Sequence, residues 1–162
     1  MNRSPSVAVV NASPLIVLCK SNLEEILPRL FNEVLVPEDV WREVVAGADA
    51  ASNRLPQLAW ARRVQVTDTH STITSWDLGA GEASVLNLAF DTPPARAMVD
   101  DKAARACART LRIPVLGTGG ALVLAKRRGI ILSVSDALND IQKVGLWLSD
   151  EIINLLKQQA GE

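Results

Sequence analysis

Short apolar runs alternate along the chain with longer amphipathic segments. The runs are rich in valine and isoleucine, as buried strands are, and they cover Val7–Val10, Val34–Val36, Val64–Val66, Ala97–Val99 and Pro114–Leu116. Between them, apolar residues recur at helical spacing, for example from Ala83 to Ala89 and from Ala103 to Leu111. This alternation of strands and helices predicts an α/β domain with a mainly parallel sheet.

Several helix boundaries can also be predicted. The segments Ser135–Val144 and Ser149–Gln159 each open with serine followed by aspartate. Serine is a favoured N-cap, and acidic side chains are favoured in the first helical turn, so both segments predict C-terminal helices. Pro37 suits the first position of the helix that follows the second strand. Pro93 and Pro94 mark a loop before the fourth strand.

Length and composition narrow the class of protein. The 162 residues are 48% hydrophobic, enough to bury one sizeable core, so we expect a single domain over residues 1–162. High hydrophobicity with a net charge of −1 excludes a disordered chain. Cys19 and Cys107 have neither disulfide-framework nor zinc-site spacing, which favours a reducing, cytoplasmic setting. No apolar run is long enough for a signal peptide or a membrane span, so no membrane partner is expected.

The charges are unevenly distributed along the chain. From Arg96 to Arg128 there are eight basic and two acidic residues, a local net charge of +6, so the remainder carries −7. A near-neutral total argues against a protein that coats polyanions indiscriminately. The segregation is still compatible with one face that attracts anions, although part of it can be explained by solvated helix positions.

Polar side chains directly follow two of the expected strands. Asn11 and Ser13 follow the first strand, and Asp100 and Asp101 follow the fourth. In open parallel sheets, ligands bind beyond the carboxyl ends of the strands. Two adjacent carboxylates repel each other unless a cation or hydrogen bonds compensate them. Capping of the next helix explains one carboxylate, so the pair indicates an acidic metal or catalytic site.

Other candidate residues and motifs carry less information by themselves. Glu43 and Glu82 lie on early helical turns, where glutamate is commonly a solvated surface residue. GTGG at 117–120 and GAGE at 79–82 lack the spacing of phosphate-binding loops. His70 lies in a polar run and has no partner serine or cysteine in a recognisable nucleophile elbow. The four tryptophans are too scattered to form a strip that stacks RNA bases.

Together these segments resemble the PIN-domain family, and more narrowly its small prokaryotic branch related to VapC-type toxins. The resemblance covers nearly the whole chain and is carried by the segments VVNASPLIVL, VPEDVWREVV, LGAGEASVLNLA, MVDDKAARACARTLRIPVLGTGGALVLAKRRGII and GLWLSDEIINLLKQQAGE. It implies a three-layer α/β/α sandwich around a central parallel sheet. In active members it also implies cleavage of RNA that depends on a divalent metal.

The resemblance assigns four acidic positions to this sequence. The first, at the end of the first strand, falls on Asn11, and the second, in the helix after the second strand, falls on Glu43. The third opens the central helix at Glu82. The fourth follows the fourth strand at Asp101, with Asp100 beside it. Ser13 matches the serine that follows the first acid by two residues.

Asn11 departs from this pattern, because catalytic PIN domains have aspartate there. An amide oxygen can ligate Mg²⁺ but brings no charge and cannot act as a base. Glu43, Glu82, Asp100 and Asp101 remain as hard oxygen donors for Mg²⁺ or Mn²⁺. The expected chemistry is metal-assisted hydrolysis of RNA phosphodiesters.

Three basic residues follow the acidic pair on one expected helix face and are the candidates for holding RNA phosphates: Lys102, Arg105 and Arg109. The leading hypothesis is a toxin-type ribonuclease restrained by a small antitoxin, with a homodimer expected from family analogy alone. The alternative is a catalytically weakened or inactive PIN-like module that binds RNA or a protein. A nucleotide-binding α/β domain of another kind is disfavoured because phosphate-loop motifs are missing.

Overall fold

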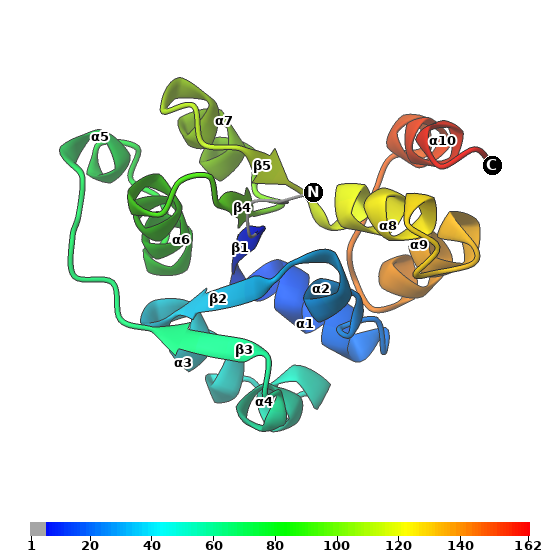
Figure 1. Ribbon diagram of the computed structural model, residues 1–162, viewed down its shortest axis with the longest axis horizontal. Coiled ribbons are helices and arrows are strands. Elements are labelled where there is room, and N and C mark those ends of the chain that lie inside the picture. The colour runs from blue at the N-terminus through cyan, green and yellow to red at the C-terminus, as the bar shows by residue number, and fades with distance from the viewer. Residues whose placement is uncertain (1–5) are drawn as a thin grey trace.

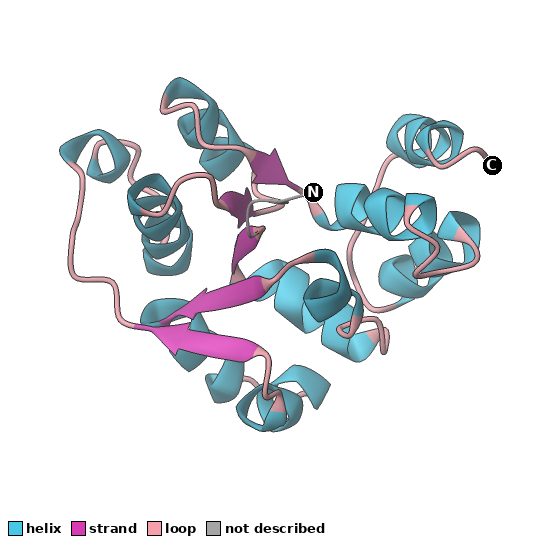
Figure 2. Cartoon of the chain, viewed as in Figure 1, coloured by secondary structure: helices cyan, strands magenta, loops and turns pink. Residues whose placement is uncertain are grey.

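The computed structural model describes residues 6–162 and contains one five-stranded sheet in the order β3-β2-β1-β4-β5. All four strand pairs are parallel. The strands are short, as Figure 2 shows, and they are β1 (Val7–Val10), β2 (Glu33–Pro37), β3 (Ala61–Val64), β4 (Arg96–Met98) and β5 (Val115–Leu116). The order places β1 in the centre, where Ala8, Val9 and Val10 are completely buried. A central parallel strand is covered on both faces, which is why its sequence is uniformly apolar.

Helices lie on both sides of the central strands. Figure 1 shows α6 and α7 on one side, and α1, α2 and the group α8 to α10 on the other. This arrangement confirms the predicted α/β/α sandwich. The helices are α1 (Ala12–Lys20), α2 (Ile26–Leu30), α3 (Glu38–Ala46), α4 (Ala50–Arg54), α5 (Ser71–Thr74), α6 (Ala80–Asp91), α7 (Lys102–Thr110), α8 (Thr118–Arg127), α9 (Val134–Lys143) and α10 (Asp150–Gln159), with a 3-10 turn η1 at Leu55–Gln57.

The third strand lies three residues earlier than predicted, at Ala61–Val64 instead of Val64–Val66. The apolar pattern did not indicate a strand at this position, because Arg62 and Arg63 occupy the middle of β3 and are exposed. Arg62 pairs with Glu33 at 3.1 Å, and Arg63 forms an ion pair with Glu38. Charged side chains are a common feature of edge strands, where they discourage pairing with another chain.

Two of the predicted helix starts also differ in detail. Pro37 was predicted as the first helical residue, but it is the last residue of β2 and the N-cap of α3, which begins one position later at Glu38. The N-cap of α9 is Ser133, whose hydroxyl accepts from the N–H of Asp136, whereas Ser135 lies within the helix. Ser149 caps α10 as predicted and accepts from the N–H of Ile152. The two C-terminal helices are therefore confirmed.

No helix within residues 6–162 has the length and apolar character needed to cross a bilayer.

Candidate functional site

Asn11 lies where β1 ends and α1 begins, and it is the N-cap residue of α1. Its N–H donates to the carbonyl of Met98 at 3.1 Å, which holds the end of β1 against β4. The side chain is only 4% exposed, and its Oδ1 has no hydrogen-bond partner within residues 6–162. A buried acceptor without a donor is costly, so this amide oxygen is suited to a cation or to a water molecule.

Glu43 reaches the same place from α3, which packs against α6. Gly81, in the first turn of α6, marks the point where the side chains of Glu43 and Asn11 meet. A β-carbon on Gly81 would lie 3.0 Å from Glu43 Oε2 and 3.2 Å from Asn11 Oδ1. The missing side chain of Gly81 therefore leaves a space into which the carboxylate and the amide oxygen both project.

Glu82 adds a second carboxylate to this region. Its side chain folds back over the start of its own helix, against the space beside the N-cap residue Gly79. Burial raises the pKa of Glu43, and the negative charge of Glu82 raises it further. The two carboxylates are thus close enough to repel each other, while the positive end of the α6 dipole favours negative charge at the helix start.

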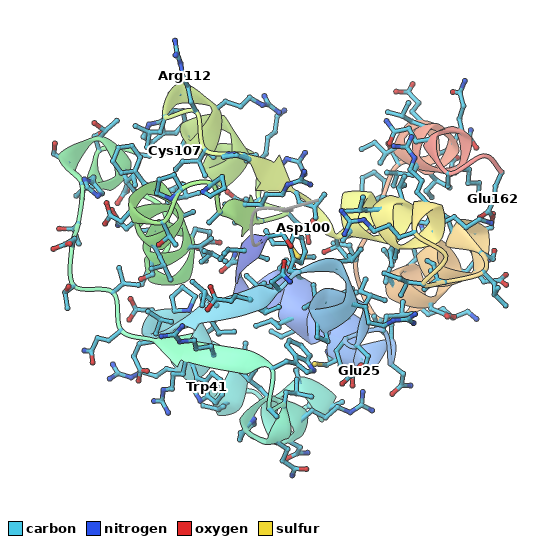
Figure 3. All side chains as sticks on the ribbon, viewed as in Figure 1. Glu25, Trp41, Asp100, Cys107, Arg112 and Glu162 are labelled. Atoms are coloured by element: carbon cyan, nitrogen blue, oxygen red, sulfur yellow. The ribbon has the colours of Figure 1, made fainter. Side chains whose placement is uncertain are left out.

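The two acids after β4 are each bound to the start of a different helix. Asp101 is the N-cap of α7 and accepts from the N–H of Ala104 at 2.9 Å. Asp100 accepts from the backbone N–H of Thr118 at 2.8 Å and from its hydroxyl at 2.6 Å. Thr118 is the first residue of α8, and Figure 3 shows Asp100 in the middle of the molecule near this helix. Hydrogen bonds at helix starts therefore compensate both carboxylates, whereas capping was expected for only one.

The basic candidates differ in exposure. Arg105 is half-buried, and its Nη1 lies 2.5 Å from the position of a β-carbon on Gly117, next to Asp100. Lys102 and Arg109 are exposed on the same helix, α7. Ser13 is exposed in the first turn of α1.

The donor set at the carboxyl edge of the sheet consists of oxygens. Within residues 6–162, no group of three or more His, Cys, Asp or Glu side chains is close enough to hold a metal ion together. The structure instead brings together Asn11 and Glu43, with Glu82 near enough to act on the pKa of Glu43. An unpartnered buried amide oxygen beside two repelling carboxylates fits a hard divalent cation such as Mg²⁺ or Mn²⁺.

Sequence reasoning missed the glycines and the threonine that shape this region. GAGE and GTGG were rejected as phosphate-binding loops, and neither motif indicated that Gly81 makes room for the oxygens of Asn11 and Glu43. The contact between Thr118 and Asp100 gave no signal, because the two residues are 18 positions apart in the sequence. The one available signal in the sequence was Gly81, which directly precedes an acidic residue, Glu82, at a helix start.

A family model for the PIN domain matches residues 7–162. The chain therefore belongs to the PIN-domain family, as its fold and the acidic end of its sheet already indicate. PIN-domain proteins are generally nucleases, and these nucleases generally use divalent metals. A comparison with curated proteins found no match to this chain.

Proposed function

We propose that this protein is an endoribonuclease of the toxin–antitoxin type that depends on Mg²⁺ or Mn²⁺ and hydrolyses RNA phosphodiester bonds. The observation that carries the proposal is the meeting of Asn11 Oδ1 and Glu43 Oε2 beside Gly81. The membership of the chain in a family of nucleases gives this donor set its chemical interpretation.

Asn11 and Glu43 would form the centre of the ion site. Glu82 and, from the end of β4, Asp101 would complete it only by moving toward a bound ion, because these carboxylates do not form one cluster within residues 6–162. A divalent cation supplies Lewis-acid stabilisation of charge on the phosphate and a lower pKa for attacking water. Asp100 provides a further catalytic carboxylate at the same edge, held by Thr118.

The remaining candidates bind the substrate. Lys102, Arg105 and Arg109 on α7 supply positive charge for RNA phosphates behind the acidic pair. Ser13 is exposed at the start of α1, two residues after Asn11, and supplies a hydroxyl for a phosphate or sugar oxygen.

A second candidate function is a PIN-like module with weakened or absent catalysis that binds RNA or a protein. Asn11 favours it, because an amide brings no negative charge to the site. The engagement of Asp100 and Asp101 at helix starts also favours it, because neither carboxylate is free of protein hydrogen bonds.

A small antitoxin or a second copy of the chain is the expected protein partner. Three large apolar side chains near α10 support such a partner, since Trp147 is 81% exposed, Leu155 51% and Ile152 45%. Ile152 and Leu155 are three residues apart on α10, and Trp147 precedes this helix by three residues. Contiguous exposed apolar residues commonly mark interaction surfaces.

Replacing Asn11 by aspartate tests the proposal. The cleavage of single-stranded and transfer RNA is measured with Mn²⁺ and with EDTA, and the binding of Mn²⁺ is measured by calorimetry. A weakened enzyme predicts that N11D binds Mn²⁺ more tightly and cleaves faster, because the new carboxylate adds charge to the ligand set. Glu43→Gln is the matched variant that removes a carboxylate from the ligand set. In the N11D background it should abolish the gain in Mn²⁺ affinity and cleavage rate. If neither the natural chain nor N11D binds the metal or cleaves RNA, the binding module is the correct interpretation.

A further inference from the structure

The first turn of α8 binds a carboxylate from another part of the fold, the end of β4. The N-cap residue of α8, Gly117, provides no side-chain cap. Asp100, at the end of β4, takes over this role with both oxygens, one on the N–H and the other on the hydroxyl of Thr118. Thr118 is completely buried. Hydrogen bonds from neutral donors to a carboxylate are short and strong, so this contact fixes the position of Asp100.

The guanidinium of Arg105 lies beside this carboxylate. A β-carbon on Gly117 would be 2.5 Å from Arg105 Nη1 and 3.2 Å from Asp100 Oδ1, so the glycine leaves space for the two groups to lie side by side. Asp100 attracts the guanidinium without being in ion-pair contact, and Arg105 makes no side-chain hydrogen bond or ion pair within residues 6–162. Its N–H donors are therefore available to a ligand.

This location is at the proposed catalytic edge of the sheet. The β1–β4 register pairs Val10 with Met98, so Asn11 is level with Val99, immediately before Asp100. Arg105 is half-buried, but none of its nitrogens is a buried atom without a partner, so its free donors are open to solvent and can reach an anion. The planar guanidinium matches the geometry of a phosphate, to which it can donate two parallel hydrogen bonds.

We propose that Arg105 is the specific phosphate contact of this site and that Asp100, fixed by Thr118, is a positioning residue whose charge attracts the guanidinium toward the space beside Gly117. The ligand is a backbone phosphate of single-stranded RNA. The inference rests on the proposed function, because it assigns one substrate contact within that site. Lys102 and Arg109 are exposed and contribute positive charge without a fixed orientation.

The test is the binding of a short fluorescent single-stranded RNA in EDTA, which prevents metal-dependent cleavage. Arg105→Ala should weaken binding about tenfold and reduce the slope of log affinity against log salt by about 0.7, the value for one lost phosphate contact. Arg105→Lys should recover the slope but not the full affinity, because an ammonium group cannot bind bidentately. Arg96→Ala is the matched control, since Arg96 is an exposed arginine at the opposite end of β4.

The positioning role is tested through Thr118. Thr118→Val removes the hydroxyl bond to Asp100 and should weaken RNA binding about threefold, whereas Thr118→Ser should restore it. In the Arg105→Ala background, Thr118→Val should add no further loss. Because Thr118 is buried, Asp100→Asn provides a second variant that alters the same contact while thermal melts monitor folding.

The outcomes separate this inference from the proposed nuclease. Equal losses for Arg105→Ala, Arg109→Ala and Arg96→Ala would mean that only diffuse charge binds RNA, and that result would overturn the phosphate contact. Absence of RNA binding by the natural chain would overturn it as well. A selective loss for Arg105→Ala, in a chain that never cleaves RNA with Mn²⁺, would support the contact and refute the nuclease.

Discussion

Glu43 Oε2 and Asn11 Oδ1 project into one space that Gly81 leaves open, at 3.0 and 3.2 Å from the position of its absent β-carbon. The two residues come from α3 and from the end of β1, which are 32 positions apart, and α6 supplies the glycine. Three elements of the fold therefore define one oxygen-lined point. This relationship gives the acidic residues of the chain a common location, and several consequences can be measured.

Gly81→Ala should block this space. The added methyl group would lie against both oxygens, so we expect Mn²⁺ affinity to fall about tenfold or more, as alterations around metal ligands commonly cause. Alanine is favoured over glycine in helices, by at most about 1 kcal/mol, the value for a helix interior, and this preference offsets part of the crowding in the first turn of α6. The melting temperature should therefore change by only a few degrees while calorimetry shows the loss of metal binding.

The control for this variant is Gly120→Ala in α8. Its β-carbon would meet only a side-chain methyl of Leu116, at 3.1 Å. It makes the same chemical change in another helix and should leave Mn²⁺ affinity unaltered. If both variants bind Mn²⁺ as the natural chain does, the space beside Gly81 is not part of a metal site.

Glu43→Gln should make the metal-free protein more stable at neutral pH. Burial and the charge of Glu82 raise the pKa of Glu43 above its ordinary value of 4.5, so the ionised form is disfavoured in the folded state. The cost of holding this charge is absent well below pH 4.5 and develops as the pH rises through the raised pKa. Urea unfolding at pH 4 and pH 7 should show a stabilising effect of the substitution at pH 7 that shrinks at pH 4.

Glu82→Gln provides a check on the cause. Removing the neighbouring charge should lower the pKa of Glu43 and reduce the stabilisation gained from Glu43→Gln. A stabilisation that is the same at both pH values would show that the charge of Glu43 is not responsible for it.

The strand pattern and the acidic positions could be read from the sequence, but the contacts that organise them could not. β1 was predicted at its observed bounds because a central parallel strand is apolar throughout. β3 was misplaced because Arg62 and Arg63 gain their ion pairs only in the folded chain, Arg62 with Glu33 of β2 and Arg63 with Glu38 of α3. Local patterns reveal burial, whereas these pairs depend on tertiary structure.

The same distinction holds for the site. The rule that strand ends gather at one edge of a parallel sheet pointed to Asn11 and Asp100. The bond between Asp100 and Thr118 joins β4 to the start of α8, and nothing in either local sequence specifies it. Gly81 was overlooked because its role is to leave space for side chains of other elements.

Substitutions of Asp101 separate its role as a helix cap from a role as a metal ligand. Asp101→Ala removes the cap of α7 and should cost about 1 kcal/mol of unfolding free energy. Asp101→Asn keeps a capping oxygen and should change stability by no more than about 0.5 kcal/mol. If Asp101 also holds the metal, Asp101→Asn should still weaken Mn²⁺ binding. An Asp101→Asn protein with unaltered metal affinity would restrict Asp101 to capping.

The side chain of Glu162, which follows α10, is hydrogen-bonded to residues of α8 and α9. Its carboxylate accepts from the N–H of Val134 at 2.6 Å, from the N–H and hydroxyl of Ser135 at 3.1 and 2.8 Å, and from Lys126 Nζ at 3.1 Å. Figure 3 shows it beside α8 and α9. These donors lower the pKa of Glu162 to about 2, with the Val134 bond as the largest cause.

Glu162→Gln should therefore destabilise the protein in a way that depends on pH. A carboxyl group whose pKa falls on folding stabilises the folded state above its ordinary pKa of 4.5, and this contribution disappears as the pH falls toward 2. The melting temperature of the variant should be below that of the natural chain at pH 7, and the difference should narrow from pH 4.5 downward. Glu151→Gln, an exposed position in the first turn of α10, should show no such trend. A difference in melting temperature that persists unchanged down to pH 3 would mean that the charge of Glu162 does not hold α10 in place.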